Sequence, residues 1–233
     1  MTEQVLALPN RCFLRVSGTD ATSFLHGQLT VAVSNDDRRP RLAAWCDAKG
    51  RVVALFRLYP IAEADWLLSF PADLAALVTR RMKMFVLRSD VQFADVSNRY
   101  LHQASPLKAE GSDDIAPILD LPTESGWREW LSPAPAETPA ADATLALIQA
   151  GIPEVFAATS GLWVPQWLNL DLLNAVDFNK GCYPGQEVVA KLKYRGAVKR
   201  RMHLSINPPE GSEIVVATNK SDGEFAALTV QRQ

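Results

Sequence analysis

Cysteine and histidine are scarce in this sequence, and none is spaced for metal binding or disulfide pairing. Of 233 residues, three are cysteines and three are histidines, all far apart. There is no Cys-x-x-Cys, His-x-x-His or His-Glu-x-x-His spacing. The sequence therefore predicts neither a zinc site nor a secreted disulfide framework, and a reducing compartment fits it better.

Several motifs and long apolar runs are also absent. Gly-x-Ser-x-Gly, the P-loop and Gly-x-Gly-x-x-Gly do not occur, so hydrolases, P-loop NTPases and Rossmann dehydrogenases lack sequence support. No stretch approaches the roughly 18 apolar residues of a membrane span, and residues 1–4 do not begin a signal peptide. The formal net charge is only -2. We expect a cytoplasmic protein with neither a membrane nor a directly bound nucleic acid as partner.

The hydrophobic periodicity predicts an α+β fold with helices packed on antiparallel sheets. The turn residues 47–50 join two strands as a hairpin. Between residues 105 and 142, Pro, Ala, Ser and Glu dominate, which predicts a flexible connection. The expected strands are 11–16, 42–45, 52–59, 66–70 and 91–96, and the expected helices are 21–29, 71–85, 145–150, 168–176 and 186–192.

The most informative stretch is Lys-Gly-Cys-Tyr-Pro-Gly-Gln-Glu at residues 180–187. Cys182 stands between two glycines, near Lys180, just before an expected helix start. A cation and a helix N-terminus both stabilise a thiolate, which is the nucleophilic form. Cys182 is therefore a candidate nucleophile, redox-active thiol or transient ligand of a soft metal. The alternative is a small buried residue in a turn, because free cysteine is among the most buried residue types.

Other candidates have similar alternatives. Gln186 and Glu187 could contact the edge of a heterocycle or cap the helix. Lys49 and Arg51, beside Asp47, could bind an anion or simply form a solvated hairpin tip. The basic run at 191–201 is either a solvated face or a surface for an acidic partner.

With these residues in view, the chain resembles the YgfZ family, folate-binding proteins related to GcvT, the aminomethyltransferase of glycine cleavage. The signature Lys-Gly-Cys-[Phe/Tyr]-x-Gly-Gln-Glu is intact at residues 180–187. Supporting blocks occur in the same order as in the family. These are Gly-Gln-Leu-Thr at 27–30, Cys-Asp-Ala-Lys-Gly at 46–50, Gly-Ile-Pro at 151–153 and Tyr-Arg-Gly at 194–196.

The resemblance implies a GcvT/YgfZ-like fold over residues 1–196, followed by a shortened β-barrel-like module at 197–233. It implies binding of tetrahydrofolate or a one-carbon derivative, and support for iron–sulfur cluster assembly or repair. Its partners would be assembly factors or client proteins, including tRNA-modifying enzymes. Cys182 and Lys180 would carry the chemistry. The expected folate-binding residues are Gln28, Asp47, Lys49, Arg51, Tyr183, Gly185, Gln186 and Glu187.

The chain also departs from its relatives. Where the T-protein carries a catalytic acid, this chain has the apolar Ala54 or Leu55. Two tryptophans found beside the folate in YgfZ relatives correspond to about Arg11 and Ala143. The missing acid argues against standard aminomethyltransferase chemistry. Two alternatives stay open beside the accessory role: a folate-dependent aminomethyl- or methyltransferase, and a non-catalytic module that docks a partner through the basic run. Full-length relatives continue beyond the position of Gln233, which predicts a compact variant or a truncated sequence.

Overall fold

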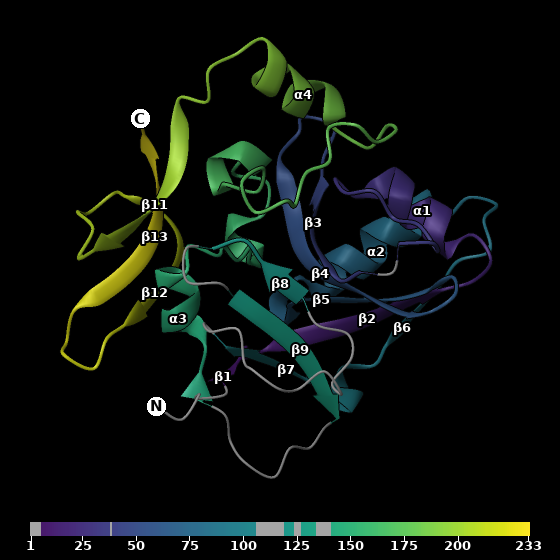
Figure 1. Ribbon diagram of the computed structural model, residues 1–233, viewed down its shortest axis with the longest axis horizontal. Coiled ribbons are helices and arrows are strands. Elements are labelled where there is room, and N and C mark those ends of the chain that lie inside the picture. The colour runs from purple at the N-terminus through teal and green to yellow at the C-terminus, as the bar shows by residue number, and fades with distance from the viewer. Residues whose placement is uncertain (1–5, 38, 106–118, 124–126, 134–140) are drawn as a thin grey trace.

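The computed structural model describes residues 6–37, 39–105, 119–123, 127–133 and 141–233 (Figure 1). Its central element is a five-stranded antiparallel sheet of order β3-β4-β5-β2-β6. β4 and β5 are buried along almost their whole length, so both faces of the sheet are covered. The strands are β2 (Arg11–Ser17), β3 (Arg41–Cys46), β4 (Val52–Ala62), β5 (Asp65–Pro71) and β6 (Gln92–Asp95).

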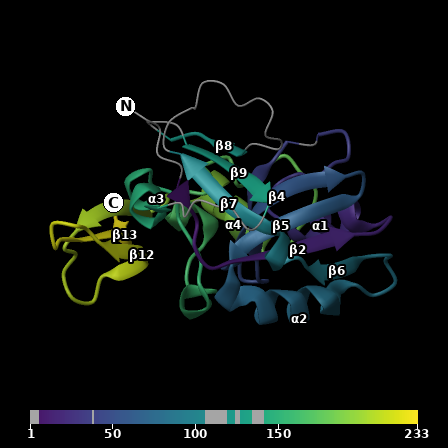
Figure 2. The ribbon, with the colours of Figure 1, turned by 90° about the horizontal axis from the view of Figure 1, so that it is seen from below.

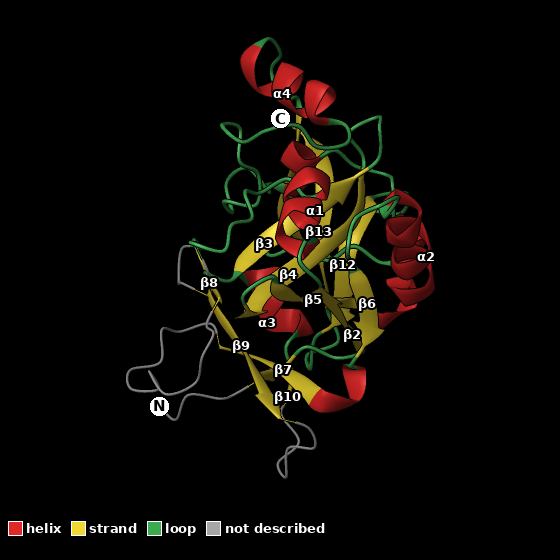
Figure 3. Cartoon of the chain, turned by 90° about the vertical axis from the view of Figure 1, so that its right-hand side faces the viewer, coloured by secondary structure: helices red, strands yellow, loops and turns green. Residues whose placement is uncertain are grey.

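Helices cover one face of this sheet, as the apolar periodicity predicted. The 3-10 turn η1 (Ala72–Leu74) leads into α2 (Ala75–Phe85), and Leu74, Val78 and Met82 are buried against the sheet. α1 (Ala21–Gln28) is fixed to the same sheet where Phe24 packs edge-on against Phe93. Figure 2 shows α2 on the opposite side of the sheet from β7 and β9, and Figure 3 shows the same arrangement.

A second five-stranded sheet, of order β10-β1-β7-β9-β8, covers the other face. β1 pairs with β10 in parallel, and the remaining pairs are antiparallel. The turn η2 (Ser97–Arg99) leads from the first sheet into β7. The strands are β1 (Leu6–Ala7), β7 (Tyr100–Ser105), β8 (Leu119–Leu121), β9 (Trp127–Pro133) and β10 (Ala141–Asp142).

This sheet corrects the prediction of a flexible connection between residues 105 and 142. β8 and β9 are regular strands, and Leu119, Leu121, Trp127 and Leu131 are buried. In these strands apolar and polar residues alternate over only a few positions, and the surrounding sequence is rich in Pro and Ala, so the pattern does not predict strands. Most of the stretch that gave rise to the prediction, residues 134–139, lies outside the described residues.

Charged side chains are buried between the two sheets. Arg57 of β4 and Glu129 of β9 are fully buried and form an ion pair of 2.9 Å. Arg57 also pairs with Glu154, which in turn accepts a 3.0 Å hydrogen bond from Arg11. Burial alone would raise the pKa of Glu129, but the charge of Arg57 and the hydrogen bonds from Arg57 and His102 outweigh it and hold that pKa below its ordinary value. The cluster therefore joins the sheets through compensated charges, and removing one partner would leave a buried charge unpaired.

His102 of β7 extends this cluster in its neutral form. Arg11 donates to the hydroxyl of Ser69, and that hydroxyl lies 2.9 Å from Nδ1 of His102. Nε2 of His102 lies 2.9 Å from a carboxylate oxygen of Glu129 and donates a hydrogen bond to it. Burial lowers the pKa of His102 to about 4, although the charge of Glu129 opposes the shift. The imidazole is therefore uncharged at neutral pH, with its proton on Nε2.

The second half of the chain follows an irregular path before the motif. α3 (Thr144–Gln149) and α4 (Gln186–Tyr194) are helices as predicted, and two 3-10 turns, η3 (Ala157–Thr159) and η4 (Pro165–Leu168), lie between them. The helix predicted over residues 168–176 is wrong. Asn169 and Asn174 have positive φ values of 58° and 55°, which interrupt a helix. The side chain of Asn169 instead donates to the carbonyl of Met202, anchoring this segment to the C-terminal sheet.

The C-terminal strands form a three-stranded antiparallel sheet of order β11-β13-β12. They are β11 (Arg200–Ile206), β12 (Glu213–Asn219) and β13 (Phe225–Arg232). Within residues 141–233 this sheet is open, so the expected barrel-like closure is not found. The division into domains at residues 196 and 197 stays a prediction. Figure 1 shows this sheet at the opposite end of the molecule from α1 and α2.

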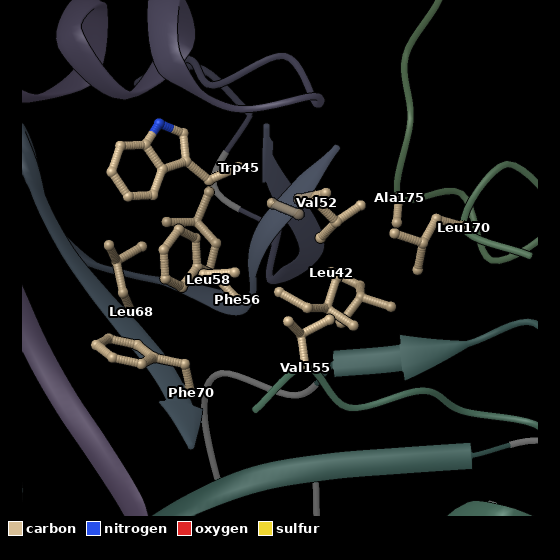
Figure 4. Packing of buried hydrophobic residues seen from close by; sticks show 14 of the residues in the cluster. Leu42, Trp45, Val52, Phe56, Leu58, Leu68, Phe70, Val155, Leu170 and Ala175 are labelled. Atoms are coloured by element: carbon tan, nitrogen blue, oxygen red, sulfur yellow. The ribbon is translucent and has the colours of Figure 1, made fainter. Parts of the chain in front are cut away.

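One hydrophobic core joins the central sheet to the segment before the motif. Leu42 and Val52 of the sheet belong to the same buried cluster as Val155, Leu170 and Ala175 (Figure 4). The irregular path through residues 152–176 is therefore held by packing, although it has little regular secondary structure. None of the described helices has the length and apolarity that a membrane crossing requires.

The buried His102 predicts a specific dependence of stability on pH. In the unfolded chain His102 takes up a proton near pH 6.5, whereas in the fold it does so only near pH 4. Between these values the unfolded state binds more protons, so the free energy of unfolding falls as the pH is lowered from 6.5 to 4. Each unit of the pKa difference corresponds to about 1.4 kcal/mol. Urea unfolding at several pH values measures this slope.

The variant His102→Gln should show a much shallower slope over this window, whatever its stability at neutral pH. His203→Gln is the matched control, because His203 is exposed on β11 and should leave the slope as it is. The same slope in His102→Gln as in the parent protein would contradict the neutral, buried imidazole.

Candidate functional site

The loop that carries the motif is fixed to the C-terminal end of α1. The amide of Asp177 donates to the carbonyl of Thr30 at 2.8 Å, and the hydroxyl of Thr30 donates to the carbonyl of Ala175 at 2.6 Å. Lys180 donates from Nζ to the carbonyls of Leu29, at 2.6 Å, and of His26. A cation at this position satisfies carbonyls that the helix leaves without partners. Lys180 therefore anchors the loop to α1.

The environment of Lys180 also changes its protonation. Burial lowers its pKa to about 8, while the nearby charges of Asp177 and Cys182 oppose the shift. Its ammonium also lies 5.1 Å from the ring centre of Tyr183, which is buried beneath it. Lys180 thus remains mostly charged at neutral pH, within electrostatic reach of Cys182, while its protons are directed at backbone carbonyls.

The far end of the motif packs directly on the β3–β4 hairpin. Gly185 precedes α4 with a φ of 77°, a left-handed conformation. A Cβ atom at this position would lie 2.5 Å from Cα of Gly50 and closer still to the carbonyl oxygen of Asp47. Gly50 has a φ of 71°, and its own Cβ would lie 3.1 Å from the carbonyl oxygen of Gly185. Both glycines are therefore needed for the backbone of the motif to touch that of the hairpin.

Of the three cysteines, only Cys182 is exposed. Burial raises the pKa of Cys12 and, more strongly, that of Cys46. A thiol must ionise to act as a nucleophile or metal ligand, so both buried cysteines are poor candidates. The structure therefore leaves Cys182 as the accessible thiol, on a loop held at both ends.

The remaining predicted site residues mostly contact the protein itself. One carboxylate oxygen of Asp47 accepts from the amides of Lys49 and Arg51, each at 2.9 Å, and so shapes the turn. Arg51 donates to the carbonyl of Leu162 at 2.7 Å and lies over Trp167. The side chains of Lys49 and Glu187 are exposed. Two glutamines form hydrogen bonds within the protein. Gln28 accepts one from Trp45 at 3.1 Å, and Gln186 donates one to the carbonyl of Lys180 at 3.4 Å.

The basic run at 191–201 does not form one free cationic face. Arg201 pairs with Asp171 through two hydrogen bonds of 2.6 and 2.9 Å, and Arg200 pairs with Glu213. Lys193 lies 4.0 Å above the ring of Phe178. A substantial part of the run therefore ties β11 and α4 to neighbouring segments.

A cavity of about 490 Å³ lies beside the segment that leads to the motif. Its walls come from the start of β3, from β8 and the residue after it, and from the loop before Ala175. Burial lowers the pKa of Arg41 in this wall, and the charge of Asp177 opposes the shift. The lining residues are Arg39, Pro40, Arg41, Leu42, Leu119, Asp120, Leu121, Pro122, Leu173 and Asn174.

No pattern in the sequence predicts this cavity. One of its walls is β8, which falls in the segment predicted to be a flexible connection. Its volume lies within the range of about 300 to 1,000 Å³ that is usual for small-molecule sites. Only five residues separate Asn174 of the cavity wall from Lys180 of the motif, so the cavity and the motif are close along the chain.

The fold places the chain in a recognisable structural class. The crystal structure of the glycine cleavage system aminomethyltransferase T from Bartonella henselae superposes with a TM-score of 0.67, covering 98% of this chain and 78% of that one. The two sequences are only 13% identical, so the likeness shows a shared GcvT-like fold. No protein-family model matches the chain.

A sequence relative then defines the family. An uncharacterized protein of Haemophilus influenzae is 32% identical over 214 residues, which cover 86% of this chain and 72% of that protein. The chain belongs to the family of this Haemophilus protein.

The contact between motif and hairpin predicts that alanine substitutions at two glycines of the motif change the free energy of unfolding by different amounts. Gly185→Ala should destabilise the protein by at least about 2 kcal/mol, because the new methyl group meets backbone on a left-handed residue. Gly181→Ala is the matched control, since its Cβ would meet only Nε2 of His26, at 3.8 Å. Urea denaturation measures both variants. Equal stability of the two variants would contradict the contact.

Proposed function

We propose that the chain is a folate-binding accessory protein of the YgfZ type, which supports the assembly or repair of iron–sulfur clusters in the cytoplasm. The observation that carries this proposal is the intact motif at residues 180–187 on a GcvT-like fold, with Cys182 as its exposed thiol. A fold alone does not define a function, so the motif is the stronger part of the argument.

The cavity between β3, β8 and the segment before Ala175 is the proposed folate site. Leu42, Leu119 and Leu121 offer an apolar wall for the pterin and aminobenzoate rings. Arg39 and Arg41 line the cavity and both pair with Asp37, so the carboxylates of the glutamate tail would compete with Asp37 for these cations. This combination of apolar surface and a few placed charges is typical of cofactor sites, and it fits tetrahydrofolate or a one-carbon derivative.

None of the residues predicted to bind folate at the motif and hairpin lines this cavity. Tyr183 is buried and Gln186 donates to the carbonyl of Lys180, so those contacts stay a separate prediction.

The structure favours the accessory role over aminomethyl transfer by the T-protein route. Ala54 and Leu55, one of which stands at about the position of the catalytic acid in the T-protein, are fully buried in β4. The buried acidic groups Glu129 and Glu154 are held by arginines within the cluster between the sheets. We therefore assign the chemistry to Cys182, acting as a thiolate toward a sulfur species, a one-carbon unit or the cluster of a client protein. Among the clients we include tRNA-modifying iron–sulfur enzymes.

Titration calorimetry with tetrahydrofolate tests the folate site. The parent protein should bind, and Arg41→Ala should lower the affinity about tenfold or more, because a charge-assisted contact to a carboxylate is lost. Arg99→Ala is the control, since Arg99 is exposed on η2, outside the walls of the cavity. Lack of tetrahydrofolate binding by the parent protein would refute the folate part of the proposal.

The role of the thiol is tested separately. Cys182→Ala should keep its folate affinity within about twofold and its stability unchanged, because the side chain is exposed. In cells that lack the endogenous family member, this variant should fail to restore the activity of iron–sulfur enzymes, whereas Cys12→Ala should restore it to the extent that it folds. Full restoration by Cys182→Ala would show that the thiol is dispensable.

A further inference from the structure

The C-terminal end of α2 carries apolar side chains that the fold does not cover. Met84, Phe85 and Leu87 have exposed fractions of 69%, 44% and 87%. Phe85 ends the apolar stripe whose buried members are Val78 and Met82, whereas Met84 lies off this stripe and Leu87 lies beyond the end of the helix. Single exposed apolar residues are common, but three within four positions form a patch of the kind that marks interaction sites.

Cations surround these apolar side chains. Arg80, Arg81, Lys83 and Arg88 occur between residues 74 and 89, and this stretch contains no Asp or Glu. None of the four forms an ion pair with a described residue, in contrast to Arg200 and Arg201 of the other basic run. The seven residues 80, 81, 83–85, 87 and 88 are called the α2 patch below.

The helix dipole does not account for the α2 patch. Cations in the last turn of a helix stabilise its C-terminus, and this explains Lys83. It does not explain Arg88, which lies beyond the helix end, or the exposed apolar side chains. A purely structural role would also not require Met84 and Leu87 to remain in water.

Part of the α2 patch is held in place. The ring of Phe85 packs edge-on against Trp45, with centroids 6.3 Å apart, and the guanidinium of Arg81 lies 5.5 Å from the same indole. Trp45 is buried on β3, immediately before the hairpin on which the motif packs. The α2 patch is therefore partly preorganised, which lowers the entropy that binding must overcome, and it is continuous with the scaffold of the motif.

We infer that the α2 patch is a docking surface for an acidic segment of a partner protein, one that presents apolar side chains among its carboxylates. An apolar centre with a charged rim is the usual anatomy of a protein interface. RNA is a poorer fit, because Phe85 is the only aromatic residue of the patch on which a base would stack. A membrane surface is also a poorer fit, since it binds a helix through its long apolar face, and that of α2 is buried. The inference depends neither on folate nor on Cys182.

Fluorescence anisotropy with a labelled amphipathic peptide tests this inference. The probe is a helix with leucines on one face and glutamates elsewhere. The triple variant Arg80→Glu, Lys83→Glu, Arg88→Glu should weaken binding at least tenfold. The double variant Met84→Ser, Leu87→Ser should also weaken it several-fold while leaving every charge in place. All five side chains are exposed, so both variants should fold.

The matched control reverses three exposed charges of the other basic run, Lys191→Glu, Arg195→Glu and Lys199→Glu, and should change binding less than twofold. Failure of the parent protein to bind the peptide would overturn the inference, as would equal loss of binding in this control. Preferential binding of anionic lipid vesicles or single-stranded RNA through the same residues would also overturn it. Self-association that the double variant abolishes, seen by sedimentation, would instead identify a second copy of the chain as the occupant and refute the acidic partner.

Discussion

The candidate site depends on a contact between two backbones. Gly185, at the end of the motif, occupies space against Asp47 and Gly50 that no side chain can share. This contact fixes the start of α4 to a hairpin whose strands belong to the central sheet. Lys180 fixes the other end of the loop to the carbonyls that close α1. Cys182 lies between these anchors, so an exposed thiol is presented by rigid elements, which is how proteins position reactive groups on loops.

The buried ion pairs link the two sheets whose strands line the proposed cavity. Arg57 links the central sheet to Glu129 of the second sheet and to Glu154 in the segment that follows α3. Burying such groups costs free energy that their mutual attraction only partly returns, so the cluster is weak evidence for stability. The cluster links β4 of the central sheet to β9 of the second sheet. β3 and β8, which line the proposed folate cavity, belong to these same two sheets.

Local patterns explain which parts of this structure could be predicted. Strong periodicity identified β2 to β6, α1, α2 and the hairpin, and the motif identified Cys182. The prediction over residues 168–176 failed because the left-handed Asn169 and Asn174 override an apolar pattern that suits a helix. β8 and β9 were missed because Pro- and Ala-rich sequence surrounds them. Periodicity does not report contacts between residues that are distant in sequence. Such contacts form the cavity, the anchors at Lys180 and Arg51, and the approach of Gly185 to Gly50. The GcvT-like fold and the Haemophilus relative establish the architecture and the family, while the chemistry rests on the motif.

The most direct test of the account is a crystal structure of the protein with tetrahydrofolate bound. The account predicts ordered ligand between Leu42, Leu119 and Leu173, with its carboxylates near Arg39 and Arg41. It also predicts Cys182 on an unmoved loop, still held by Lys180 and Gly185. Ligand bound elsewhere, with this cavity empty, would contradict the central claim that this cavity is the folate site.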